Sequence, residues 1–373
     1  MRPLVAILLG LAAASALAHK PSDSYLAVRV ERASVSVQWD IALRDLDFAI
    51  GLDDNGDGDI TWGEVKAHRE DIAAYALARL KLRSDGADCA VRSTEFLVDD
   101  HSDGAYAVMR FAGTCPAEVE TIEISYSLFA DLDPQHKGLL RLEHGPATRT
   151  GIFSPERATQ SFELAKISAL SQFLDYGREG VWHIWIGFDH ILFLLSLLLP
   201  AVLVFETGRW RAIERFPPAF WDVFKIVTSF TVAHSITLSL AALGVIMLPS
   251  RLVESAIATS VVLAALNNVL PLVHGRRWMV AFAFGLIHGF GFASVLRDLG
   301  LPQGALLIAL VGFNLGVEGG QLAIVSPFLP AAYALRASWV YQRLVFSGGS
   351  LAIVCVAGIW LVERAFNMKI ITP

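Results

Sequence analysis

Six apolar segments in the second half of the chain limit the fold more than any other feature. They lie at about residues 181–205, 220–248, 252–273, 279–296, 304–329 and 338–362. Each segment is long enough, or nearly so, to cross a hydrocarbon core of about 30 Å. Lipid offers no partners to backbone polar groups, so such segments cross the bilayer as helices. The sequence therefore predicts a bundle of six transmembrane helices over residues 181–365.

The residues before this bundle have a different composition. Charged side chains are dense up to about residue 178 and sparse afterwards, and the net charge of the chain is −6. This contrast predicts a multi-domain chain, in which a soluble domain precedes the membrane domain. No basic run suited to nucleic acid is present, so we do not expect a polynucleotide partner.

The N-terminus predicts export of the soluble domain. Residues 1–18 combine one arginine, a short apolar core and a small-x-small ending, as in a signal peptide cleaved before His19. An uncleaved anchor is the alternative, but the apolar run is short for a span. The free amino group and imidazole of His19 would together offer a copper chelate, although a merely solvated N-terminus is the simpler interpretation. Residues 19–160 then form an extracytoplasmic domain and residues 161–180 a linker.

The distribution of arginine agrees with that orientation. With the N-terminal domain outside, the first, third and fifth loops between the spans face the cytoplasm, as the positive-inside rule requires. We therefore expect a multi-pass protein of the bacterial inner membrane, with its N-terminal domain in the periplasm. The arginines of these cytoplasmic loops are Arg209, Arg211, Arg215, Arg276, Arg277, Arg336 and Arg343.

The exported domain shows strand patterning. Apolar and polar residues alternate from Ser24 to Ile41, and similar runs recur at about residues 94–98, 105–111 and 121–128. Period-two alternation indicates half-buried strands, so we expect a β-sandwich-like domain interrupted by a helical insertion. Cys89 and Cys115 lie in this exported domain, where an oxidising environment favours a disulfide between them.

The insertion contains an acidic loop at residues 53–64, followed by a helical stretch that we expect from Val65 to Leu82. The loop has the spacing of an EF-hand, with a glycine at the sharp turn and a glutamate at position twelve. The alternative is an acidic surface turn without an ion. Since there is no evident second hand, we expect a structural Ca²⁺ clamp with an EF-hand-like helical insertion around it. Its ligands would be Asp53, Asn55, Asp57, Asp59 (through its carbonyl) and Glu64.

Ionisable side chains inside the apolar segments predict a second ion site. Such groups are costly in a bilayer and usually mark an ion or substrate pathway. Imidazoles and carboxylates without thiolates suit divalent transition metals such as Ni²⁺, Co²⁺ or Zn²⁺. The alternative is that these side chains only hydrogen-bond helices together. The candidate ligands are His183, Asp189, His190, His234, His288 and Glu318, and the candidate pathway residues are Thr231, Ser235, Glu254, Asn267, Asn268, Asn314 and Gln321.

Helical spacing refines this expectation. Asn314, Glu318 and Gln321 share one face of their helix, as do Thr231, His234 and Ser235. His183 and His190 also share a face, but they lie about 10 Å apart along a straight helix. We therefore expect His183 nearer the outer mouth and not on the same ion as His190.

Four motifs in the membrane domain resemble the HupE/UreJ family of hydrogenase and urease accessory membrane proteins, in its branch with a large exported domain. The resemblance covers roughly residues 180–365. It implies nickel, and sometimes cobalt, permeation for metalloenzyme assembly, with the histidines and aspartate of the first motif as metal ligands. The motifs are His183-x5-Asp189-His190, Ala233-His234-Ser235, Gly285-Leu286-Ile287-His288-Gly289 and Asn314-Leu315-Gly316-Val317-Glu318.

These observations lead to one preferred function and two alternatives. The preferred one is a permease for a divalent transition metal, which is not an enzyme and which works in the lipid bilayer, with a periplasmic or metalloenzyme-assembly partner. The first alternative is an intramembrane hydrolase in which Zn²⁺ activates water. The second is a membrane-anchored receptor whose exported domain binds a partner.

Overall fold

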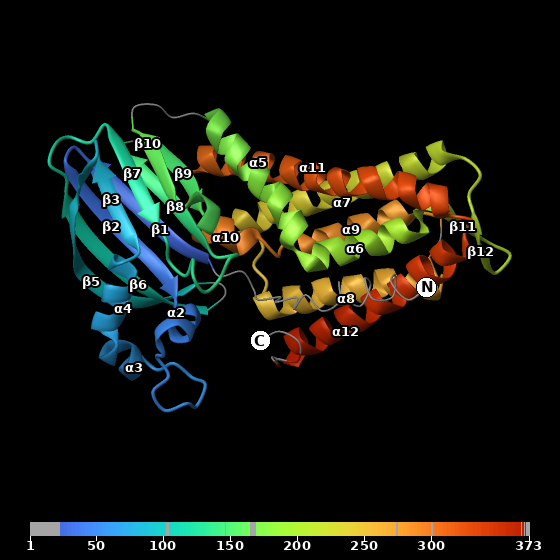
Figure 1. Ribbon diagram of the computed structural model, residues 1–373, viewed down its shortest axis with the longest axis horizontal. Coiled ribbons are helices and arrows are strands. Elements are labelled where there is room, and N and C mark those ends of the chain that lie inside the picture. The colour runs from blue at the N-terminus through green and yellow to red at the C-terminus, as the bar shows by residue number, and fades with distance from the viewer. Residues whose placement is uncertain are drawn as a thin grey trace.

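A β-rich region and a helical region lie end to end along the long axis of the molecule (Figure 1). The computed structural model describes residues 23–101, 104–145, 147–164, 169–273, 275–299, 301–366, 368 and 370. The expected signal peptide, residues 1–18, and His19 lie outside these residues. Residues 23–164 are called the exported domain, after the expected export, and residues 169–366 are called the membrane domain.

The exported domain contains two sheets that face each other across one core. The first has the strand order β5-β6-β2-β1-β8-β9, and the second has the order β10-β7-β3-β4. Strand β1 pairs in parallel with β8, and the other pairs are antiparallel. The strands are β1 (Asp23–Glu31), β2 (Ser34–Ala42), β3 (Leu80–Ser84), β4 (Ala87–Asp88), β5 (Ala90–His101), β6 (Gly104–Thr114), β7 (Thr121–Tyr126), β8 (Lys137–His144), β9 (Ala147–Phe153) and β10 (Thr159–Glu163).

Alternating side chains account for this core. Val28, Val37 and Trp39 point inward from the first sheet and are at most 3% exposed. The ring of Trp39 packs against Tyr126 of the second sheet, with centroids 5.5 Å apart. A disulfide joins Cys89 to Cys115 at the edge of this core, and it is the pair that the sequence singles out.

The insertion between β2 and β3 is helical but shorter than expected. It contains α2 (Leu43–Ile50), α3 (Trp62–Ala67) and α4 (Arg69–Leu77). The expected continuous helix over Val65 to Leu82 is wrong, because the chain breaks at His68 and Leu80 begins β3. Leu80 and Leu82 alternate into the core of the sheets, and this burial outweighs helical propensity.

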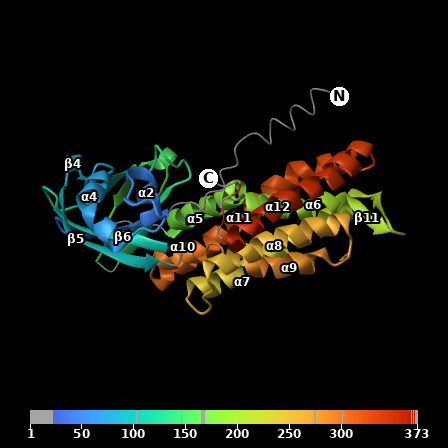
Figure 2. The ribbon, with the colours of Figure 1, turned by 90° about the horizontal axis from the view of Figure 1, so that it is seen from below.

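The membrane domain is a bundle whose long helices run along one axis (Figure 2). The short hairpin of β11 and β12 lies at the end opposite the exported domain (Figure 1). The elements are α5 (Ala169–Ile186), α6 (Phe188–Leu198), η2 (Leu199–Val202), β11 (Leu203–Glu206), β12 (Arg209–Ala212), α7 (Phe216–Ala242), α8 (Ser250–Val269), α9 (Arg277–His288), α10 (Ala293–Asp298), α11 (Gln303–Leu335), the π-helix η3 (Val340–Gly348) and α12 (Gly349–Phe366).

The spans differ in detail from the six that the sequence predicts. Within the described residues, four helices are long and apolar enough to cross a membrane, or five if the bent pair α5 and α6 counts as one span. The expected fourth span, 279–296, is not one helix, because α9 has 12 residues and the chain breaks between His288 and Ala293. Twelve residues extend about 18 Å, less than a hydrocarbon core. Residues 161–180, expected as a linker, contain the end of β10 and the first twelve residues of α5.

Glycines bring α5 and α11 into backbone contact. A Cβ on Gly180 would lie 2.0 Å from the carbonyl oxygen of Phe313, and one on Gly316 would lie 1.9 Å from that of Gly177. Small residues allow such close approach between membrane helices. Gly319, also on α11, has no atom within 4 Å of its Cβ position. The contact therefore depends on particular glycines and fixes α5 against α11.

The two domains meet at the end of the bundle where α10 lies. His101 of β5 lies between Asp40 of β2 and Asp298 of α10, with Nε2 3.1 Å from Asp40 Oδ2 and Nδ1 3.7 Å from Asp298 Oδ2. All three side chains are about 10% exposed. The rings of Tyr25 and Tyr106 pack against the imidazole, with centroids 5.0 and 4.2 Å from it. Burial alone lowers the pKa of His101, but the carboxylates of Asp298 and Asp40 raise it to about 9.

This contact predicts a pH-dependent stability. The pKa of His101 is higher in the folded protein, at about 9, than its ordinary value of 6.5, so its stabilising effect is complete below pH 6.5 and is lost as the pH rises through 9. The pH-dependent part is at most about 3 kcal/mol. Thermal unfolding of the wild type and of His101→Gln should show a difference that shrinks between about pH 6.5 and 9.5. A constant difference over that range would contradict the assignment.

Candidate metal site in the membrane domain

A sharp helix break places two histidines side by side. Helices α5 and α6 meet at Gly187 at an angle of 72°. His183 lies in the last turn of α5 and His190 in the first turn of α6, and their ring centroids are 4.5 Å apart. The expectation that His183 and His190 cannot share an ion is therefore wrong, because it assumed a straight helix.

A third histidine completes the group. Within the described residues, His183, His190 and His234 form a group that could hold a metal ion, with ligand atoms all within 4.8 Å of one another. His234 lies in the middle of α7, and its Nδ1 is 3.1 Å from Asn314 Oδ1 of α11. No hydrogen-bond partner among the described residues reaches Nε2 of His190 or of His234, although both atoms are buried. Unpaired buried nitrogens of this kind fit a metal ion as their partner.

Asp189 orients one of these ligands. Its Oδ1 accepts hydrogen bonds from the backbone N–H of His190, at 2.8 Å, and lies 2.9 Å from Nδ1 of the same residue. Its Oδ2 lies 3.9 Å from the guanidinium of Arg364 on α12. A carboxylate on one imidazole nitrogen fixes the ring and leaves the other nitrogen for a metal. Asp189 therefore lies beside the candidate ligand His190, with both of its own oxygens engaged.

His288 lies next to this group but not in it. It is the last residue of α9, and its ring centroid is 5.1 Å from that of His190. Its Nε2 is 2.9 Å from Ser260 Oγ on α8, and its buried Nδ1 has no partner among the described residues. Sequence reasoning missed Ser260, because a serine within an apolar helix carries no signal until its neighbour is known.

Glu318 is separate from the three histidines. Its Oε1 accepts a hydrogen bond from Thr228 Oγ1 at 3.0 Å, and Thr231 donates to Gln321 Oε1 at 3.3 Å. Both contacts join α7 to α11. Thr228, like Ser260, was not identified from the sequence. The three polar residues expected on one face of α11 therefore have different partners. Asn314 contacts a histidine of the group, whereas Glu318 and Gln321 contact threonines of α7.

The remaining pathway candidates make local or interhelical contacts. Ser235 Oγ donates to the carbonyl oxygen of Thr231 at 2.7 Å. Asn267 closes the end of α8 by bonding to the backbone of Leu272 and Val273, whereas Asn268 Nδ2 donates to the Ser196 carbonyl and to Ser350 Oγ. The Glu254 carbonyl accepts a hydrogen bond from Arg364. None of these contacts involves the group of three histidines.

Aromatic rings surround the histidines. Phe292 and Phe313 stack on each other, with centroids 4.3 Å apart, and both lie about 5 Å from His183. Phe193 and Phe230 pack in the same way against His288. An apolar shell of this kind limits access of water to the ligand atoms.

The acidic loop of the exported domain has the turn geometry of a cation loop. Asp53 accepts backbone hydrogen bonds from Gly56 and Gly58, both of which have positive φ. The hydrogen bond from Gly58, followed by others from the loop backbone, holds the pKa of Asp53 below its usual value. Glu64 Oε2 accepts from the N–H and the hydroxyl of Thr61 in a capping box. These bonds hold the carboxylates close together on an exposed loop.

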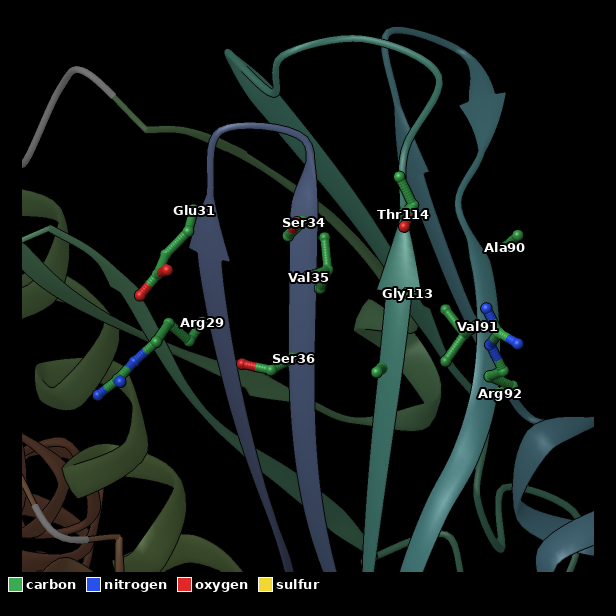
Figure 3. A pocket seen from close by; sticks show the side chains of 11 residues that line it. Arg29, Glu31, Ser34, Val35, Ser36, Ala90, Val91, Arg92, Gly113 and Thr114 are labelled. Carbon is green, nitrogen blue, oxygen red and sulfur yellow. The ribbon is translucent and has the colours of Figure 1, made fainter.

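A groove of about 680 Å³ crosses the first sheet where β1 and β2 turn (Figure 3). Arg29, Glu31 and Arg92 line it. The groove lies at the C-terminal end of β1. The other end of β1 starts at Asp23, which pairs in the sheet with Lys137, and Lys137 contacts the membrane domain. Arg29 is already paired with Glu143, at 2.8 Å, so the charges of the groove do not converge on one point.

A substitution at Gly187 tests whether the helix break positions His183 and His190 for metal binding. A Cβ there would lie 2.6 Å from the His183 carbonyl oxygen and 2.9 Å from His190 Nδ1, although the backbone angles suit alanine. We expect Gly187→Ala to weaken Co²⁺ binding about tenfold, which corresponds to roughly 1.4 kcal/mol, measured from the visible absorption of Co²⁺ in the purified protein. Gly319→Ala, where a Cβ meets nothing within 4 Å, is the control. Equal affinities of the two variants would contradict this role of Gly187.

Comparison with known proteins identifies the family of the chain. No significant match to a curated protein was found. A family model described as HupE / UreJ protein matches residues 158–364, which include every helix of the bundle except the last two residues of α12. The family is associated with accessory membrane transport of nickel and cobalt and is generally not enzymatic. The chain belongs to the HupE/UreJ family of multi-pass membrane proteins.

Proposed function

We propose that this protein is a permease for a divalent transition metal, nickel or cobalt before others, that supplies metalloenzyme assembly. The observation that carries the proposal is the group of His183, His190 and His234, whose ligand atoms lie within 4.8 Å of one another and of which the last two residues are buried. Neutral imidazole nitrogens suit Ni²⁺ and Co²⁺, and within the described residues no thiolate belongs to the group. Family membership supports the same substrate class.

The location of the group favours transport. His190 lies in the first turn of α6 and His288 is the last residue of α9, so two helix breaks lie next to the histidines. Broken helices at ligand sites are a recurring feature of transporters, because irregular backbone is tolerated where it lines an ion pathway. Export of the N-terminal domain to the periplasm of a bacterial inner membrane, with residues 1–18 as signal peptide, is part of this proposal.

The ligands have distinct roles in the proposed cycle. His183, His190 and His234 hold the metal ion, and Asp189 and Asn314 each fix one imidazole ring through its Nδ1. His288, 5.1 Å from His190 and hydrogen-bonded to Ser260, is the next nitrogen ligand along the bundle. Glu318 lies farther along, against Thr228, as a carboxylate for the ion after it leaves the histidines.

Uptake into proteoliposomes is the decisive measurement. We expect the wild type to take up Ni²⁺ or Co²⁺. The uptake rate of His234→Gln should be at least about tenfold lower, because one of three ligands is removed. Ser326→Ala, whose hydroxyl only bonds to the carbonyl of Ala323 on its own helix, is the control and should be unaffected.

The outcomes separate the alternatives. A wild type that transports no metal but retains zinc through purification, and that loses this zinc in His234→Gln, would favour the intramembrane hydrolase, since three histidines also suit catalytic Zn²⁺. Loss of cellular function only on mutation of the exported domain would favour a receptor. Either result would overturn the permease.

We also propose that residues 53–64 bind a structural Ca²⁺ ion through Asp53, Asn55, Asp57, the Asp59 carbonyl and Glu64. The backbone bonds to Asp53 and Asn55 and the positive φ of Gly58 support this proposal, since an EF-hand loop turns sharply at its sixth position.

Calcium should therefore raise the unfolding temperature of the wild-type protein. Asp53→Asn and Glu64→Gln keep the hydrogen-bonding shape of the loop but remove ligand charge, so we expect most of the calcium-induced increase to disappear. Glu70→Ala, an exposed acid on α4, should keep it. Thermal unfolding with Ca²⁺ and with chelator measures the difference, and an unchanged calcium response in both loop variants would exclude the site.

A further inference from the structure

A lysine of the exported domain reaches the membrane domain next to the histidines. Lys137 is the first residue of β8, and its Nζ donates a hydrogen bond to Glu179 Oε2 on α5. The two side chains are only 15% and 12% exposed, so this ion pair is largely removed from solvent. It joins the two domains through buried charges of opposite sign.

Glu179 lies one helical turn before the metal site. It precedes His183 by four residues on α5, and residues so spaced lie on the same face, about 5–6 Å apart at Cβ. The ammonium of Lys137, hydrogen-bonded to Glu179, therefore lies about one helical turn from His183.

The framework around Glu179 restricts what can move. The backbone of α5 contacts that of α11 at Gly180 and Gly316, without room for a Cβ. On the other side, Leu139 and Ile152 of the exported domain pack in one apolar cluster with Tyr176. The flexible part of the arrangement is therefore the lysine side chain, whose four-carbon stem rotates freely once its pair is broken.

We propose that Lys137 is a tethered cation that closes the outer side of the metal site, and that Glu179 is the carboxylate that receives the entering divalent cation when Lys137 withdraws. This inference rests on the proposed permease function. A lysine ammonium and a divalent cation compete for one carboxylate, so the two occupancies exclude each other. By linkage, metal binding and the contact of Lys137 with the membrane domain weaken each other by the same factor.

Removal of the lysine should favour the metal. Lys137→Met keeps the apolar stem but leaves Glu179 as a buried charge without its partner, which is costly unless a cation replaces it. We expect Co²⁺ to bind about tenfold more tightly to this variant than to the wild type, and to raise its unfolding temperature more. Lys137→Gln serves as a second variant if Lys137→Met does not fold.

A matched control and a double variant isolate the pair. Arg157→Met removes a neighbouring ion pair between the domains, in which Arg157 lies 3.3 Å from Asp175. The side chains of both residues are 32% exposed. We expect this control to bind Co²⁺ like the wild type. In Lys137→Met with Glu179→Gln, the gain in affinity should disappear, because the carboxylate that receives the ion is gone.

The results distinguish the inference from the function on which it rests. If the wild type neither binds nor transports Co²⁺ or Ni²⁺, the permease proposal itself fails. If the wild type transports Co²⁺ and His234→Gln does not, but Lys137→Met binds the ion no better than Arg157→Met, then Lys137 only holds the domains together and the inference is overturned. Increased affinity that persists in the double variant would overturn it as well.

Discussion

The unfavourable burial of an unpaired imidazole is the constraint on which the membrane domain depends. His190, His234 and His288 each have one buried ring nitrogen without a partner among the described residues. The other ring nitrogen of each lies within hydrogen-bond distance of Asp189, Asn314 or Ser260, respectively. Burial of a polar atom without a partner is unfavourable, so each of these nitrogens is a candidate position for a bound ligand. The surrounding helices, their breaks and their glycines all serve to hold these rings in place.

The glycines explain how the rings are brought together. Gly187 lets the chain turn by 72° between two histidines, and Gly180 and Gly316 let α5 lie backbone to backbone against α11. Each contact lacks space for even a methyl group. Because α11 also carries Asn314, the close approach positions the partner of His234. The packing of α5 against α11 therefore also sets the position of a residue that contacts the histidine group.

Two ion pairs connect the exported domain to helices near the histidine group. His101 meets Asp298 just beyond the break after α9, and Lys137 meets Glu179 one turn before His183. Both ion pairs connect the first sheet with the membrane domain: Glu179 lies on α5, which carries His183, and Asp298 lies on α10, which follows α9. Charge pairs with so little exposure are sensitive to pH or to a competing cation, since neither partner is well solvated.

Much of the organisation was predictable from local patterns. Alternating residues indicate the strands from Asp23 to Ala42, the apolar runs indicate the membrane helices, and the ionisable residues within them indicate where an ion site lies. Errors arose where tertiary contacts outweigh local preference. Leu80 and Leu82 leave the expected helix because the sheet buries them, and α9 ends at His288, although the apolar sequence continues.

The sequence by itself determined which chemical groups the membrane domain buries, because hydropathy and residue type do not depend on geometry. Only the tertiary structure decided which of them meet. His183 and His190 lie about 10 Å apart on a straight helix, yet their ring centroids are 4.5 Å apart across the break. The distance depends on one turn of the backbone at Gly187, and the periodicity of a sequence contains no information about where a helix bends in space.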